Sequence, residues 1–186
     1  MADPLAATLA AAFAADPLMA HALPDAAARA RRLPRLFGAV LRACRVAGGV
    51  AAVGDGAAVA GWRRGDAVPA PAALLLRSGL VLAPALIGPG ATRRLMAQES
   101  ACEAAIREGF GAAPFAYLWA IGVAPARQGQ GLGAEMLTQA LAALPDRRWV
   151  LKTEREEVLP FYARAGFAPV RRITPEGGIP AIILAR

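Results

Sequence analysis

The sequence predicts a single α/β (α+β) domain over residues 1–186, with a central sheet flanked by helices. Two observations lead to this prediction. Segments whose apolar residues recur at helical spacing alternate along the chain with short, strongly apolar segments that are typical of strands. The chain also has neither an internal repeat nor a linker that would divide it into two domains.

The composition is that of a folded protein without a membrane span. Hydrophobic residues make up 56% of the chain, which excludes a disordered protein. The longest apolar run, residues 79–91, is too short to cross a membrane and contains proline and glycine. The N-terminal segment carries Asp3 and no basic leader, so we expect a helix there and not a signal peptide.

The cysteines and the single histidine do not form a recognisable metal site. Cys44, Cys102 and His21 have no metal-ligand spacing, and two cysteines do not make a disulfide framework. We expect no metal, and we expect a reduced, cytoplasmic protein. His21 has no evident catalytic partner and is interpreted as structural.

The net charge of +7 raises the possibility of a nucleic-acid partner. The arginines are scattered in pairs, however, and no basic stripe with interleaved aromatic residues is present. A solvated basic surface is the better interpretation, so we expect no nucleic-acid partner.

Apolar periodicity predicts the elements of the first 110 residues. The hairpin strands are Val50–Val53 and Ala57–Arg64, joined by a turn at residues 54–56. Of the helices, one begins at Thr92 as its N-cap and ends at Gly109. The other predicted helices are residues 3–15, residues 26–46, and a buried helix over residues 74–88 that is broken near Pro84.

The C-terminal half predicts the centre of the sheet. Residues 115–123 are almost continuously apolar, as in a strand covered on both faces. A glycine-rich loop and a helix that ends at Pro145 follow. The remaining predicted elements are a strand at 148–153, a short helix at 159–166, and two closing antiparallel strands at 167–173 and 178–186.

The loop PARQGQGLGA, residues 125–134, joins the central strand to its helix. Glycines without Cβ atoms let a pyrophosphate approach the backbone, whose amides and following helix N-terminus favour an anion. A Walker loop is excluded, because no Gly-Lys-Ser/Thr follows. Gly129-x-Gly131-x-x-Ala134 formally matches a dinucleotide fingerprint, but it lies too far from its strand and from the chain start.

The sequence resembles the GNAT N-acetyltransferase superfamily, and within it the puromycin N-acetyltransferase-like branch. Gln128-x-x-Gly131-x-Gly133, preceded by Ile121-Gly122-Val123, is similar to the coenzyme A loop of that superfamily, and residues 158–167 are similar to its tyrosine helix. The similarity covers most of the chain and is loose over residues 66–110. It implies a mixed, mostly antiparallel sheet and acetyl-CoA as cosubstrate.

The resemblance also implies the residues of the site. Ile121 and Val123 would contact the pantetheine arm, the loop would hold the pyrophosphate, and Arg127 would add charge at its rim. Glycine within a strand invites a bulge or the close approach of a ligand at Gly122. The implied cofactor-binding residues are Ile121, Gly122, Val123, Arg127, Gln128, Gly129, Gln130, Gly131, Leu132, Gly133 and Ala134.

Two residues carry the catalytic roles that the resemblance implies. The N–H of Val123 would stabilise the oxyanion, and the Tyr162 phenol would protonate the leaving thiolate. Tyr117 is a poorer candidate for the acid. Glu99 and Glu103, four residues apart on one helix, either bind a cationic amine or lie at the surface.

The sequence departs from the branch at three places. Lys152 stands where relatives commonly have glutamate, and Val158 stands where they have an asparagine that helps hold the cofactor. Glu154 points to the same face of its strand as Lys152 and is either a substitute carboxylate or a solvated charge. The strand that opens the chain in relatives is missing or the sheet is shortened.

The predicted function is transfer of an acetyl group from acetyl-CoA to an amine of a small molecule, by direct attack in a ternary complex. The apolar residues 72–91 suggest a partly hydrophobic amine. A degenerate CoA-sensing domain, a protein or peptide N-acetyltransferase and a nucleic-acid-binding module remain alternatives. Either a monomer or a homodimer is compatible with the sequence.

Overall fold

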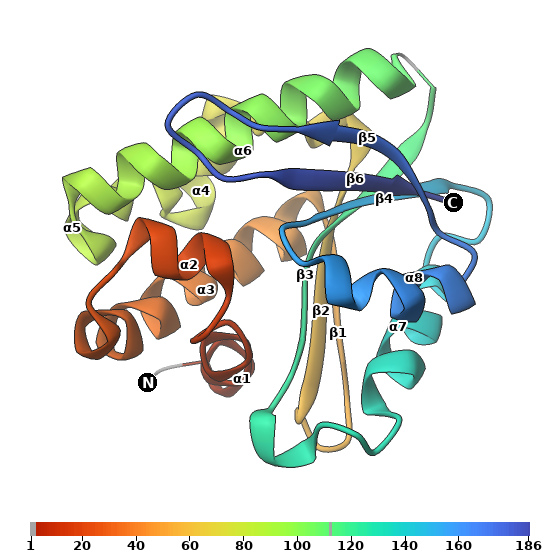
Figure 1. Ribbon diagram of the computed structural model, residues 1–186, viewed down its shortest axis with the longest axis horizontal. Coiled ribbons are helices and arrows are strands. Elements are labelled where there is room, and N and C mark those ends of the chain that lie inside the picture. The colour runs from red at the N-terminus through yellow and green to blue at the C-terminus, as the bar shows by residue number, and fades with distance from the viewer. Residues whose placement is uncertain (1–2, 112) are drawn as a thin grey trace.

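The computed structural model describes residues 3–111 and 113–186 and forms one six-stranded sheet with helices on both faces (Figure 1). The strand order is β1-β2-β3-β4-β6-β5. Only β3 and β4 are parallel among the neighbouring strands described, so the predicted mixed, mostly antiparallel sheet is confirmed. The strands are β1 Gly48–Val53, β2 Ala58–Arg64, β3 Phe115–Val123, β4 Arg148–Thr153, β5 Ala168–Ile173 and β6 Ala181–Ala185.

The first three helices begin at aspartate caps. Asp3, Asp16 and Asp25 each accept a hydrogen bond from a backbone N–H of the first turn, which satisfies donors that have no partner within the helix. Proline at the start of α1 and of α2 also fits, since that position needs no N–H donor. The helices are α1 Pro4–Ala12, α2 Pro17–Ala22, α3 Ala26–Ala47, α4 Ala72–Ser78, α5 Ala83–Ile87, α6 Pro89–Phe110, α7 Leu132–Ala142 and α8 Leu159–Arg164.

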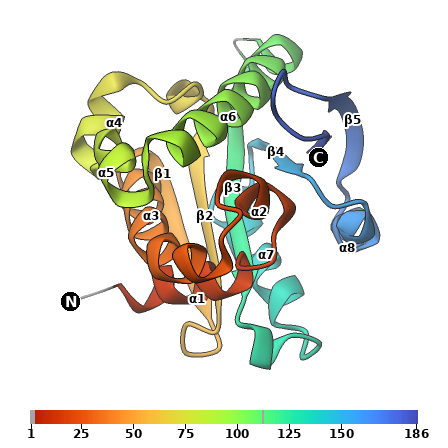
Figure 2. The ribbon, with the colours of Figure 1, turned by 60° about the vertical axis from the view of Figure 1, so that its left-hand side comes forward.

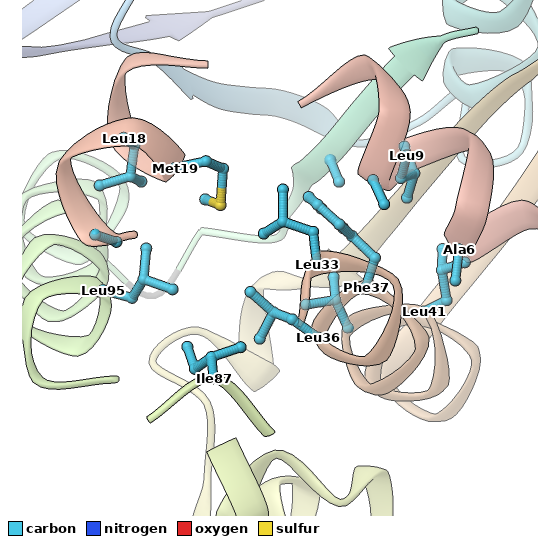
Figure 3. Packing of buried hydrophobic residues seen from close by; sticks show 14 of the residues in the cluster. Ala6, Leu9, Leu18, Met19, Leu33, Leu36, Phe37, Leu41, Ile87 and Leu95 are labelled. Carbon is cyan, nitrogen blue, oxygen red and sulfur yellow. The ribbon is translucent and has the colours of Figure 1, made fainter. Parts of the chain in front are cut away.

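Two layers of helices enclose the sheet. On one face α1 and α3 pack on β1, β2 and β3, as Figure 2 shows, while α6 packs against β6. On the other face α7 packs on β1, β2 and β3, and α8 contributes Tyr162 to the same apolar cluster. Figure 3 shows the first layer, in which Leu9 of α1, Met19 of α2 and Phe37 of α3 belong to one buried cluster with Leu95 of α6.

The central pair of strands separates along its length. β3 pairs with β4 only from Phe115 to Leu118, whereas β3 itself continues to Val123. At the point of separation β3 has a bulge, because Gly61 of β2 lies opposite Ala120 and Trp62 lies opposite Leu118. Trp119 is therefore an extra residue, and a bulge of this kind bends the strand and re-aims its side chains.

Most of the predicted elements are confirmed, but their ends differ. Thr92 does not cap α6; the helix starts at Pro89, and Thr92 lies inside it and donates its hydroxyl to the Gly88 carbonyl. Gly109 does not stop α6 either, since Gly111 at φ 56° is the C-cap. Residues 74–88 do not form one buried helix. They divide into α4, a short 3₁₀ turn and α5, with Gly79 in the left-handed conformation between them.

One helix was missed and one expectation needs correction. Helix α2 was not predicted, because six residues are too few to show a helical period. Gly122 is not at the bulge: its lack of a side chain lets α1 approach β3, and a Cβ there would lie 2.7 Å from the Ala12 Cβ. The N-terminal strand of relatives is not formed by the described residues, in which α1 comes first.

The contact of α1 with Gly122 gives a prediction about stability. Replacing Gly122 by Ala forces α1 away from β3, and we expect the free energy of unfolding to fall by about 1–3 kcal/mol. The matched control is Gly109→Ala in α6, where a Cβ meets no atom within 4 Å and φ is not positive. That change should stabilise the helix by about 0.5–1 kcal/mol. Urea unfolding of both variants measures the difference, and a Gly122→Ala protein as stable as wild type would contradict the packing argument.

Candidate active site

The backbone of Val123 faces the opening between β3 and β4. The Ala124 N–H donates to the Ala57 carbonyl of the β2 side at 2.7 Å. Because hydrogen-bonding direction alternates along an antiparallel strand, the N–H groups of Ile121 and Val123 point the other way, toward β4. No described residue of β4 pairs with them there. The Val123 carbonyl accepts a hydrogen bond from the Gln128 side chain at 3.1 Å. The Val123 N–H itself has no acceptor among the described residues of β4 or the loop, so it is a free donor in the opening.

The glycine-rich loop also presents free backbone donors. Within the described residues, no hydrogen bond is made by the N–H groups of residues 129–133. Gly129 and Gly131 adopt φ values of 76° and 81°, which strongly favour glycine. A Cβ on Gly133 would meet Val123 and Phe161 at 3.5 Å, so this end of the loop lies against the opening.

The remaining loop residues occupy the outer side of the turn. Arg127 is exposed, and its Nε donates to the Gln130 side chain at 2.8 Å. Leu132 packs at the edge of the α7 cluster, and the N–H of Ala134 is bonded to the Gly131 carbonyl within the first helical turn. The backbone N–H groups without an acceptor are thus those of residues 129–133, at the N-terminus of α7, where the helix favours an anion.

Tyr162 of α8 lies on the same side of the opening as the loop. Its ring packs edge-on against Phe161 and Phe167, with centroids 5.0 and 6.0 Å away. Burial, reinforced by the charges of Asp16 and Glu154, raises the pKa of Tyr162 to about 12. The phenol therefore keeps its proton at neutral pH. Tyr117, by contrast, is fully buried in a different apolar cluster, and its hydroxyl has no hydrogen-bond partner among the described residues.

A cavity of about 750 Å³ connects the two faces of the sheet through the opening. On the α7 side it is lined by Val123, Gly133 and Tyr162, and it passes Ile121 and Gly122 of β3 and Leu151 of β4. On the other side it extends between α1, α2, α3, α5 and α6. Val158, the residue noted above as a departure from the asparagine of similar sequences, lies in its wall.

A buried cluster of charges lies beside the opening. The Lys152 ammonium is 2.8 Å from a Glu99 oxygen and 2.7 Å from a Glu154 oxygen. Burial opposes the charge on the lysine, but the two carboxylates outweigh it and hold the pKa of Lys152 well above its usual range. Glu154 is therefore not a solvated charge, since only 7% of its side chain is exposed.

The two glutamates of α6 have different partners. Glu99 accepts a second hydrogen bond from the Trp119 indole at 3.0 Å, which anchors the bulge of β3. Glu103 forms a buried ion pair with Arg63 of β2 and also accepts the Ala70 N–H. Neither glutamate is a simple surface residue. The Arg63 guanidinium in turn stacks 3.8 Å from the centroid of the Trp119 ring.

Three of these residues were not identified from the sequence. Arg63, next to Arg64, was interpreted as one of the paired arginines of a solvated surface, yet it is completely buried. Trp119 was read as part of a strand and Asp16 as a helix end. Asp16 caps α2 and also lines the cavity, and burial together with the charge of Glu154 raises its pKa. His21 Nε2 lies 3.2 Å from the Gly177 carbonyl oxygen, its one hydrogen-bond contact among the described residues, and its structural role stays a prediction.

The chain matches one known domain family over the part that contains this site. Residues 100–169 match the family model of the acetyltransferase (GNAT) domain. This segment runs from α6 through β3, the glycine-rich loop, α7 and α8 into β5. The GNAT resemblance is therefore confirmed for the segment that holds the loop and Tyr162.

Solved structures confirm the fold over a longer part of the chain. One is the crystal structure of histone acetyltransferase HPA2 and related acetyltransferase from Corynebacterium glutamicum, with 23% identity, a TM-score of 0.64, and coverage of 96% of this chain and 86% of that chain. Another is Drosophila melanogaster polyamine N-acetyltransferase, which catalyses the formation of N-acetylagmatine, with 12% identity and a TM-score of 0.50. It covers 70% of this chain and 68% of that chain. The chain has the GNAT fold.

Two searches of the described residues concern other classes of protein. No described helix is both long and apolar enough to cross a membrane. In the same residues, no group of three or more His, Cys, Asp and Glu side chains is arranged to hold a metal ion.

The ion pair between Arg63 and Glu103 gives a second prediction about stability. Glu103→Gln leaves the Arg63 guanidinium buried without its counter-charge, and we expect a loss of about 3–5 kcal/mol in the free energy of unfolding. The control is Glu108→Gln on the same helix. Glu108 pairs with Arg171 where both side chains are about half exposed, and its loss should cost less than about 1 kcal/mol. Guanidinium unfolding at pH 7 measures both, and equally small losses would show that the buried pair is not a structural requirement.

Proposed function

We propose that the protein is an acetyl-CoA-dependent N-acetyltransferase that acetylates an amine of a small molecule by direct attack in a ternary complex. The observation that carries the proposal is the free Val123 N–H, which meets the glycine-rich loop and the Tyr162 phenol at one end of a cavity through the sheet. The match of residues 100–169 to the acetyltransferase domain supports the same reaction class.

The residues of the loop fit a pyrophosphate. The free N–H groups of residues 129–133 supply several donors, and Gly129 and Gly131 leave open space in front of them. Arg127 would add positive charge at the rim, while Ile121 and Val123 would pair with the amides of a pantetheine arm. When bound, acetyl-CoA supplies the activated acyl group as a thioester.

The chain's own groups supply orientation and charge stabilisation. The Val123 N–H donates to the oxygen on which negative charge develops when the amine attacks the carbonyl carbon. The Tyr162 phenol delivers a proton to the sulfur as the carbon–sulfur bond breaks. The amine loses a proton to water or to a carboxylate of the cavity wall, and the Tyr162 phenolate takes up a proton from the same water in turn, which balances the transfer.

The shape of the acceptor side favours a small molecule over a peptide. Helices α2, α3, α5 and α6 line that end of the cavity. A small molecule can lie among them with its amine at the opening, whereas a peptide acceptor would call for an open groove. The puromycin N-acetyltransferase-like branch remains a prediction from sequence, and it does not identify puromycin as the acceptor.

The first experiment is calorimetric titration with acetyl-CoA, using NAD and ATP as controls. We expect a dissociation constant in the micromolar range for acetyl-CoA alone, since enzymes commonly bind such substrates between about 1 μM and 1 mM. Thiol release can then be followed with a thiol reagent during an amine screen. Burial raises the pKa of Cys44 and of Cys102 to about 12, so neither thiol of the protein competes at pH 8. Binding without thiol release from any amine would favour a CoA-sensing domain, and no binding would reject the proposal.

The role of Tyr162 is tested by removing its hydroxyl. We expect Tyr162→Phe to lower kcat by about 10²–10⁴-fold while the affinity for acetyl-CoA stays the same, because a general acid acts on the transition state. The matched control is Tyr117→Phe, which removes a buried hydroxyl that has no partner among the described residues and lies outside the cavity wall. That variant should keep its rate. An unchanged kcat in Tyr162→Phe would remove the acid role.

A further inference from the structure

Lys152 is the only lysine among the 21 basic residues of the chain. The site that it occupies suits a compact ammonium better than a guanidinium. The described arginines largely lie at the surface or donate to backbone carbonyls. Lys152 instead places its charge inside, with 8% of its side chain exposed, between carboxylates of α6 and β4. A point-like ammonium with rotatable donors fits such a site, whereas a planar guanidinium needs more space.

The cation site around Lys152 is held from several sides. Glu99 is fixed by the Trp119 indole, and Glu154 lies 3.4 Å from the Gln98 side-chain nitrogen. Gln98 is itself completely buried and bonded to the backbone of Ile179 through both its oxygen and its nitrogen. Each of the two carboxylates therefore has a hydrogen-bond partner besides Lys152, so both stay next to the cavity as acceptors for an ammonium when the lysine is replaced.

The wall near the opening keeps an excess of negative charge after Lys152 is counted. Asp16, Glu99 and Glu154 line this part of the cavity. Glu103 is already paired with Arg63, and Arg155, which also lines the wall, is paired with Glu157. Three carboxylates against one ammonium attract a further cation. An amine that binds here lies beside the opening, where Tyr162 and the Val123 N–H are also found.

The opposite end of the cavity offers no unpaired carboxylate among the described residues, since Glu103, which accepts the Ala70 N–H there, is paired with Arg63. All the residues that α3, α4 and α5 contribute to the wall are apolar. Figure 3 shows Leu36 of α3, Ile87 of α5 and Leu95 of α6 directed toward the same space. Hydrocarbon is favoured at this end, whereas a second ammonium would lose its water without gaining a counter-charge.

We propose that the acceptor is a lipophilic primary monoamine, and that Lys152 sets this selectivity by filling the site which a second ammonium of a diamine would otherwise take. The proposal rests on the acetyl transfer proposed above. The amine nitrogen lies at the acidic end next to the opening, and the hydrocarbon body extends toward α3 and α5. Lys152 is thus a specificity-determining residue for the acceptor, and it takes no part in the transfer.

The test compares hexylamine with 1,6-diaminohexane, which have the same carbon chain and differ by one ammonium. Calorimetry on the protein saturated with CoA measures binding without chemistry. In the wild type we expect hexylamine to bind about tenfold more tightly or better, because the diamine must bury an unpaired charge. In Lys152→Met the diamine should gain at least about tenfold relative to hexylamine, because its flexible chain can fold back so that Glu99 and Glu154 accept the second ammonium while the first stays beside the opening.

Controls separate the possible failures. Arg147→Met makes the same change of charge at an exposed position just before β4 and should keep the wild-type order. If Lys152→Met does not fold, the double variant Lys152→Gln with Glu154→Gln preserves net charge and leaves Glu99 for the second ammonium. Equal or tighter diamine binding in the wild type, no binding of either amine, or an unchanged order in the Lys152 variants would overturn the inference. If the binding order holds but no thiol is released from either amine, the proposed function fails and the inference about the pocket stands.

Discussion

The separation of β3 from β4 beyond Leu118 is the constraint on which the rest of the site depends. A parallel pair that continued would use the N–H of Val123 in the sheet and would close the passage between the two faces. The bulge at Trp119, in the pairing with β2, lies where the pairing with β4 stops, and a bulge of this kind redirects the strand. One irregular residue thus frees a backbone donor, opens the cavity and brings the glycine-rich loop against it.

An opened sheet must still satisfy its polar groups and fill its space. Charged side chains supply the polar partners: Arg63 pairs with Glu103, and Lys152 pairs with Glu99. Glu99 and Arg63 also hold Trp119, through its indole N–H and its ring face. Buried ion pairs contribute little net stability, because desolvation offsets their attraction. Their value here lies in holding one arrangement of β2, β3, β4 and α6, in which the strands stay apart.

The sequence predicted the sheet, the loop and Tyr162 because each depends on local chemistry. A continuous apolar run, glycines at fixed spacing and a tyrosine within an amphipathic turn are visible in a few neighbouring residues. The bulge and the charge cluster were not predictable in this way. Trp119 is recognised as an extra residue only when β3 is aligned with its partner strand β2. Arg63 and Glu103 are 40 residues apart in the sequence, so no local pattern pairs them. Gly122 was noticed, but the neighbour that requires it is Ala12 of α1, which no local pattern reveals.

The same distinction separates what the site shares with related folds from what is particular to this chain. In the proposed function the acyl donor is bound by backbone groups of β3 and of the loop, which do not depend on the identity of the side chains around them. The acceptor end is built from side chains of α2, α3, α5 and α6, which the bulge does not constrain. Lys152 lies where these two parts meet. Its charge is held by Glu99 of α6 and Glu154. If the protein acts as proposed, the effect of that charge falls on the acceptor, so one side chain would change the choice of amine without changing the geometry of transfer.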